Sequence, residues 1–200
     1  MHRALTARLF IAVDPPPAVS EQLAAWARTA AREMSRRSGA PPRVLDAELL
    51  HVTLCFLGNR STEEIDPIAE RLAECKAPTG ELSLGAPLWL PPRHPRALAV
   101  ELHDEQGRLT SLQRSVLTAC GDPGERQTIS ARRQPARPTE HRHFRPHITV
   151  VRMRSGSAPR ERALPPTPAL SFVPGELVLY RSWLSPQGAS YEAVATYPIG

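Results

Sequence analysis

One short pattern, a histidine and a threonine separated by a single residue, occurs in two strand-like segments of this 200-residue chain. The first segment is Leu50–Gly58, LHVTLCFLG, and the second is Pro146–Arg152, PHITVVR. In both, apolar residues alternate with the motif residues, which predicts a strand with one apolar face and one face that carries the histidine and the threonine. A lone H-x-T is weak evidence of function. Its recurrence in a chain with only seven histidines is hard to attribute to chance.

Strict alternation assigns the residues of the first segment to two faces. Val52, Leu54 and Phe56 are expected to face the core, and His51, Thr53 and Cys55 the opposite side. A cysteine beside the histidine could act as a nucleophile, but a small, neutral filler is the better interpretation of a lone thiol.

The order strand, helix, H-x-T strand occurs twice, at residues 8–57 and again at residues 98–152. This regularity predicts an internal duplication. Two related lobes would pack with pseudo-two-fold symmetry and bring the two H-x-T strands face to face. We therefore expect a single bilobal domain over residues 1–200, in which two distant motifs form one site.

The rest of the chain adds three helices, further strands and one long loop. Helices are predicted after Pro15–Pro17, after a capping box at Ser61–Glu64, and before Gly121. Residues 122–145 carry almost no apolar side chains and predict a mobile loop. Residues 122–162 hold ten arginines against four acidic residues, while the whole chain has a net charge of +5. This charge favours a phosphate-bearing partner, and a solvated basic loop is the alternative.

Composition excludes several other classes of protein. No apolar run approaches the roughly 20 residues of a membrane helix, so we expect a cytoplasmic protein. The three cysteines form no C-x-x-C pair, and no Walker, Rossmann or G-x-S-x-G motif is present. His141, His143 and His147 could bind zinc, but the neighbouring arginines oppose a dication. We therefore expect neither a metal nor a cofactor.

Two histidines and two threonines suit the hydrolysis of a phosphodiester without a metal. One histidine can activate water as a base, and the other can protonate the leaving oxygen as an acid. The two must lie on opposite sides of the phosphorus, because attack and departure are roughly in line. The threonine hydroxyls can donate hydrogen bonds to the non-bridging oxygens, where charge develops.

At these residues the chain resembles the two-histidine (2H) phosphoesterase superfamily, which is defined by paired H-x-T-x motifs. It looks most like the RNA 2′,3′-cyclic phosphodiesterase family, long called 2′-5′ RNA ligases. The opening RLFIAVD, both motif strands and the closing ELVLYRSWLSPQGASYEAVATYPI share that family's order and spacing. The region Asp122–His143 departs from it, being longer and richer in arginine.

The resemblance implies a bilobal α+β fold, with antiparallel sheets flanking a central cleft and helices on the outside. It implies that His51 donates a proton to the leaving 3′ oxygen and that His147 accepts a proton from water. Thr53 and Thr149 would bind the phosphate, and Arg152 would help to hold the substrate. Strict alternation turns Arg152 away from His147, a conflict that a strand end or a bulge would resolve.

The activity implied is opening of a 2′,3′-cyclic phosphate to a 2′-phosphomonoester, at the end of an RNA or on a nucleotide. The alternatives are 2′-5′ ligation at the same site and an RNA-end-binding module without turnover. No obligate protein partner is implied, and the family favours a monomer.

Overall fold

An antiparallel β-sheet organises the computed structural model, which describes residues 5–38, 42–75, 79–121, 144–153, 164–185 and 188–199. Within these residues the strand order is β7-β4-β5-β6-β3-β1-β8-β9, and β2 pairs with β6 off this path. The strands are β1 (Thr6–Val13), β2 (Arg43–Val44), β3 (Val52–Ser61), β4 (Leu82–Leu90), β5 (Ala97–His103), β6 (His147–Arg152), β7 (Ser171–Phe172), β8 (Glu176–Ser185) and β9 (Gly188–Pro198).

The two motif strands, β3 and β6, are neighbours at the centre of this sheet, where Val52 pairs with Ile148. β1 flanks β3 and β5 flanks β6, so the four central strands follow the symmetrical order β5-β6-β3-β1. Each half therefore contains a first strand and its own H-x-T strand, as the duplication predicts. The two halves form one continuous sheet rather than two separate sheets.

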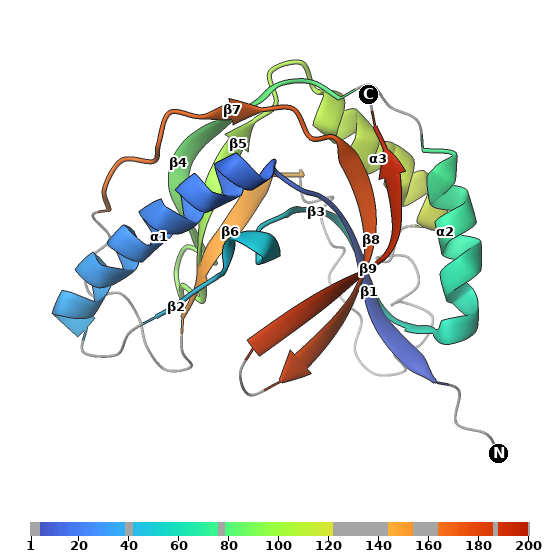
Figure 1. Cartoon of the computed structure of the whole chain (residues 1–200), viewed down its shortest axis with the longest axis horizontal. Helices are drawn as coiled ribbons and strands as arrows, with labels where there is room; N and C mark the ends of the chain where they lie inside the picture. The colour runs from blue at the N-terminus through green and yellow to red at the C-terminus, as the bar shows by residue number, and fades with distance from the viewer. Residues whose placement is uncertain are drawn as a thin grey trace.

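Three α-helices of the described chain cover the outer side of the arched sheet (Figure 1): α1 (Pro17–Ser38), α2 (Ile65–Ala73) and α3 (Arg108–Cys120). α1 follows β1 in the chain but packs on β6 and β2, and α3 follows β5 but packs on β3. Each helix thus covers the half of the sheet that contains the other motif, which ties the halves together. α2 packs beside α3.

The core lies between the helices and this side of the sheet. Its fully buried side chains include Ile11, Leu23, Val52, Leu112 and Ile148, each 0% exposed. Burying one such side chain stabilises the folded state by roughly 1.5–3 kcal/mol. Because the core covers only one side of the sheet, the alternate residues of β3 and β6 remain available on the other side.

Local sequence determines where the helices begin and end. α1 begins at Pro17, whose fixed φ and missing amide hydrogen suit the first helical turn. Before η2 (Thr62–Glu64), which leads into α2, the Ser61 side chain accepts from the Glu63 amide while the Ser61 amide donates to Glu64 at 3.0 Å. Gly121, with φ of 72°, ends α3 in the region that favours glycine. All three boundaries confirm the sequence predictions.

The sequence patterns missed β2, β7 and the 3-10 helix η1 (Ala47–Leu49), each only two or three residues long. Elements this short contain too few residues to show a period. Residues 122–143 of the predicted loop 122–145 lie outside the described residues. Among the described helices, none has the length and apolar character that crossing a membrane requires.

Candidate active site

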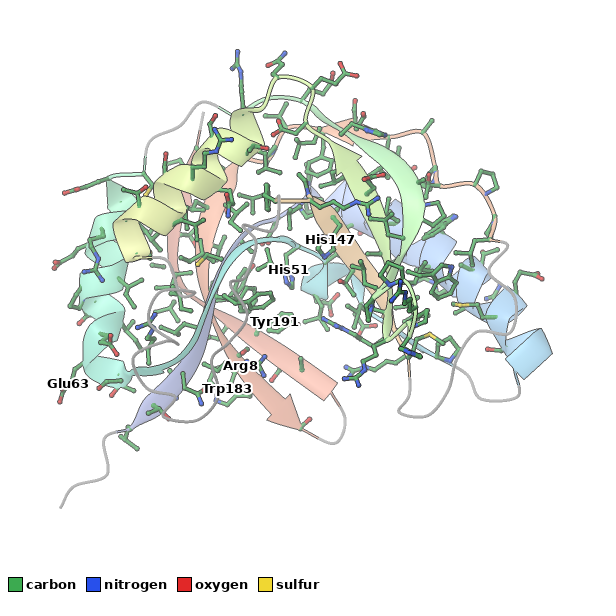
Figure 2. The ribbon with its side chains drawn as sticks, turned by 180° about the vertical axis from the view of Figure 1, so that it is seen from behind. Arg8, His51, Glu63, His147, Trp183 and Tyr191 are labelled. Atoms are coloured by element: carbon green, nitrogen blue, oxygen red, sulfur yellow. The ribbon has the colours of Figure 1, made fainter. Side chains whose placement is uncertain are left out.

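The central register pair places four motif side chains on the side of the sheet away from the core. β3 and β6 are antiparallel, so this pairing sets His51 across from Thr149 and Thr53 across from His147. Each histidine therefore lies opposite the threonine of the other motif. Figure 2 shows His51 and His147 on these neighbouring strands. We call this side of the sheet the motif face, and all four predicted residues meet on it.

The two histidines share one tautomer. Nδ1 of His51 donates to the carbonyl oxygen of Leu49 at 2.8 Å, and Nδ1 of His147 donates to the carbonyl oxygen of Arg145 at 2.8 Å. A carbonyl oxygen can only accept, so each Nδ1 carries the hydrogen. In both rings Nε2 is left to exchange a proton with a ligand. Each histidine thus donates to the carbonyl oxygen of the residue two positions earlier, and this hydrogen bond fixes the same tautomer in both motifs.

An ion pair supports the second of these hydrogen bonds. Nε of Arg145 donates to Oε1 of Glu101 at 2.8 Å, and Glu101 of β5 pairs with His147 of β6. The Arg145 carbonyl that accepts from His147 is therefore held from the neighbouring strand. No sequence pattern indicates this contact, because Glu101 and Arg145 lie 44 positions apart in the chain.

Aromatic rings surround His51 on the β1, β8 and β9 side. The ring centroid of Phe10 lies 4.9 Å from that of His51, and Tyr191 meets His51 edge-on at 5.2 Å. Tyr180 stacks on Phe10 at 5.1 Å. These contacts fix the imidazole plane and remove water from one side of it. Alternation in β1 predicts that Phe10 lies on this face, but nothing in the sequence indicates that Tyr180 and Tyr191 join it.

The pKa of His51 is lowered to about 4. Burial is the main cause, because it penalises the charged imidazolium, and electrostatic interactions with Arg152 and His147 act in the same direction. The hydrogen bond to Leu49 opposes them. Without a ligand, His51 is therefore neutral near pH 7.

Arg152 lies on the motif face because β6 contains a bulge. Between Thr149 and Val151 the register with β5 skips Val150, and Val150 and Val151 are both 0% exposed. The extra residue reverses the alternation and turns Arg152 to the side of His51. This irregularity resolves the conflict between strict alternation and the family pattern.

Two bulges in β3 overturn a different expectation. The register with β1 skips Leu54 and again Leu57, and the Leu54 carbonyl instead accepts from Gln113 of α3 at 3.5 Å. As a result Cys55 is 4% exposed in the core, whereas Phe56 is 60% exposed. The prediction that Phe56 faces the core and Cys55 the histidine side is therefore wrong. A thiol buried in the core is not placed to attack a substrate.

A half-buried carboxylate lies behind the aromatic group. The Tyr180 hydroxyl donates to Oδ2 of Asp14, while Oδ1 of Asp14 is buried with no hydrogen-bond partner. Burial raises the pKa of Asp14 and also that of Tyr180. Asp14 borders a cavity of about 650 Å³ at the start of α1, which none of the four motif residues lines. This cavity is therefore separate from the histidines.

The zinc alternative cannot be built from the described residues. His141 and His143 lie outside them. In the part of the chain that the structure describes, no three His, Cys, Asp or Glu side chains are grouped so as to hold a metal ion.

Comparisons with known proteins agree with this geometry. The chain is 31% identical over 156 residues to an RNA 2′,3′-cyclic phosphodiesterase of Geobacillus stearothermophilus, a match that covers 74% of this chain and 45% of that protein. It is 30% identical over 148 residues to an RNA 2′,3′-cyclic phosphodiesterase of Archaeoglobus fulgidus, covering 74% of this chain and 73% of that protein. The chain thus spans less than half the length of the first relative.

The crystal structure of E. coli LigT complexed with ATP has the same fold, with a TM-score of 0.72 at 23% identity over 98% of this chain and 99% of that one. The α+β fold with antiparallel strands, predicted from the resemblance, is confirmed. A model of the 2′-5′ RNA ligase superfamily matches residues 15–182. The chain belongs to the 2′-5′ RNA ligase superfamily.

Proposed function

We propose that this chain is an RNA 2′,3′-cyclic phosphodiesterase that opens the cyclic phosphate to a 2′-phosphomonoester. The observation that carries the proposal is the antiparallel pairing of β3 with β6, which sets two H-x-T pairs against each other on one face. The names of both curated relatives support the same activity. The substrate class is therefore RNA, or a nucleotide, that ends in a 2′,3′-cyclic phosphate.

The two histidines divide the proton transfers. His147 takes a proton from water through Nε2 as the water oxygen bonds to phosphorus. The bond from phosphorus to the 3′ oxygen breaks, and His51 gives its Nε2 proton to that oxygen. Water thus supplies the oxygen added to phosphorus, one proton passes from water to His147, and one passes from His51 to the 3′ oxygen. Afterwards His147 is protonated and His51 is neutral, so a proton exchange with solvent restores the site.

His51 must be protonated to act as the acid, although its pKa in the free protein is about 4. Raising that pKa to about 7 requires about 4 kcal/mol, because each pKa unit corresponds to about 1.36 kcal/mol. One phosphate charge about 4 Å away supplies about 4 kcal/mol at an effective dielectric constant of 20. Binding of the substrate anion is therefore sufficient to charge His51. The acid then forms only when a phosphate is present.

The remaining motif residues hold the phosphate. Thr53 and Thr149 donate their hydroxyls to the non-bridging oxygens, one from each strand. Arg152 adds a full positive charge on the same face and offsets the negative charge that develops in the transition state. Hydrogen bonds to charged groups contribute roughly 1.5–3 kcal/mol each.

Substitution of each histidine tests this mechanism. His51→Gln and His147→Gln should each lower kcat for a 2′,3′-cyclic nucleotide about 10²–10⁴-fold while leaving the thermal unfolding profile intact. His94→Gln is the matched control, since His94 lies in the exposed turn between β4 and β5. If either variant retained the turnover of the control, the two-histidine mechanism would be wrong.

A further inference from the structure

Arg43 lies directly beside Arg152 and has no assigned role. The two residues pair across the short β2–β6 ladder, and residues that pair in this way project to the same face. Because the bulge in β6 turns Arg152 to the motif face, Arg43 also projects there. Because β5 occupies one edge of β6, β2 pairs along the same edge as β3, beyond the Val52–Ile148 pair. The site therefore has a second guanidinium at its outer edge.

These two arginines differ from the ion-paired arginines of the same protein. Arg60 pairs with Glu64 at 3.6 Å, and Arg145 pairs with Glu101 at 2.8 Å. Within the described residues, no carboxylate pairs with Arg43 or Arg152. Like charges directly opposite each other in a sheet destabilise it. Anions bound beside them would offset this repulsion.

The Arg43 side chain extends from β2 to the end of the β8–β9 hairpin. Its guanidinium occupies the space where a side chain on Gly188 would begin. Gly188 has φ of 130°, so both the backbone and the close approach favour glycine there. Figure 1 shows the hairpin ending on the side of the arch where β2 lies. Arg43 therefore connects the two halves of the protein at the outer edge of the motif face.

We infer that Arg43 forms a second anion site, which binds the RNA phosphate on the 5′ side of the terminal nucleotide. This inference rests on the proposed function. The charge of Arg152 interacts with His51, so we assign Arg152 to the phosphate that reacts there. Beyond the cyclic phosphate, the next negative charge of an RNA end is the phosphate on the 5′ oxygen of the same nucleotide. Arg43 gives the enzyme a preference for ends that carry this group.

Two small substrates isolate this contact: adenosine 2′,3′-cyclic phosphate, and the same nucleotide with a 5′-phosphate. The measured quantity is the ratio of their kcat/KM values, the 5′-phosphorylated form over the other. Wild type should prefer the 5′-phosphorylated substrate, and Arg43→Gln should lower the ratio about tenfold, as expected for loss of one charge-assisted contact. Arg43→Lys keeps the charge and should restore part of the preference. Arg28→Gln, on the exposed surface of α1, is the matched charge control.

Each possible result either supports or overturns a second anion site at Arg43. A lower ratio for Arg43→Gln, with the control at the wild-type ratio, supports a second anion site. An equal loss with both substrates would mean that Arg43 acts through its contact with Gly188, and an unchanged ratio would mean that it touches no phosphate. Both results overturn this inference and leave the proposed function standing. If wild type hydrolysed neither substrate, the proposed function itself would fail, and this inference with it.

Discussion

Val52 of β3 pairs with Ile148 of β6, and this pair joins the two halves of the sheet. Both side chains are 0% exposed and point into the core beneath α1 and α3. Each lies between the histidine and the threonine of its own motif. The packing of two apolar side chains therefore sets the spacing of four polar ones on the opposite face.

Removing bulk from this pair should affect both stability and chemistry. Ile148→Ala should lower the free energy of unfolding by about 2–5 kcal/mol, because it leaves a cavity in the core. It should also lower kcat, because the two motif strands lose the contact that sets their spacing. Leu177→Ala, at a 0% exposed position of β8, is the control. It should lose similar stability in denaturant titrations but keep the kcat of its folded fraction. Equal kcat values for the two variants would contradict this role of Ile148.

The threonine hydroxyls should contribute to the transition state more than to substrate binding. Thr53→Val and Thr149→Val keep the branched shape but lose the donor, so each should lower kcat about 10–100-fold with a smaller effect on KM. Thr→Ser at either position retains the hydroxyl and should recover most of the activity. Steady-state kinetics on a 2′,3′-cyclic nucleotide measure both parameters. A Val variant with normal kcat would remove that threonine from the mechanism.

The protonation of His51 should depend on whether an anion is bound. In the free protein the imidazole should titrate near pH 4, because burial and electrostatic interactions with Arg152 and His147 disfavour its charged form. A bound 2′-nucleotide places negative charge beside the ring and should raise this pKa toward about 7. NMR titration of the imidazole carbons, assigned with His51→Gln, measures both values. The same pKa with and without the nucleotide would mean that His51 does not become the acid in this way.

Cys55 should matter for stability and not for turnover. It is 4% exposed in the core, on the side of β3 opposite the histidine. Cys55→Ala should therefore lower the free energy of unfolding by about 1 kcal/mol and leave the kcat of the folded enzyme unchanged. Thermal unfolding and an activity assay separate the two effects. A loss of turnover without a loss of stability would restore the thiol as a candidate nucleophile.

The sequence predicted the helices, the long strands and the meeting of His51 with His147, because each depends on a regular period or on a repeated motif. It failed where the period is interrupted. The bulges at Leu54, Leu57 and Val150 insert one residue each, and an inserted residue exchanges the two faces for every residue after it.

The sequence patterns also could not predict contacts between segments that are distant in the chain. Tyr191 meets His51, and Arg43 meets Gly188, only because β8 and β9 fold back against the first half of the chain. Such contacts follow from the order of strands in the sheet, and no local pattern of residues contains that order. The resemblance to a family supplied the roles of the motif residues but not these neighbours.

The most direct test of the account is the identity of the product formed in the presence of a chelator. The purified protein is incubated with adenosine 2′,3′-cyclic phosphate in EDTA, and ³¹P NMR distinguishes the two monophosphates that ring opening can give. Two-histidine catalysis with departure of the 3′ oxygen predicts the 2′-phosphate alone, at a rate that EDTA does not change and that His147→Gln lowers about 10²–10⁴-fold. A 3′-phosphate product, or activity lost in EDTA and restored by zinc, would contradict the account.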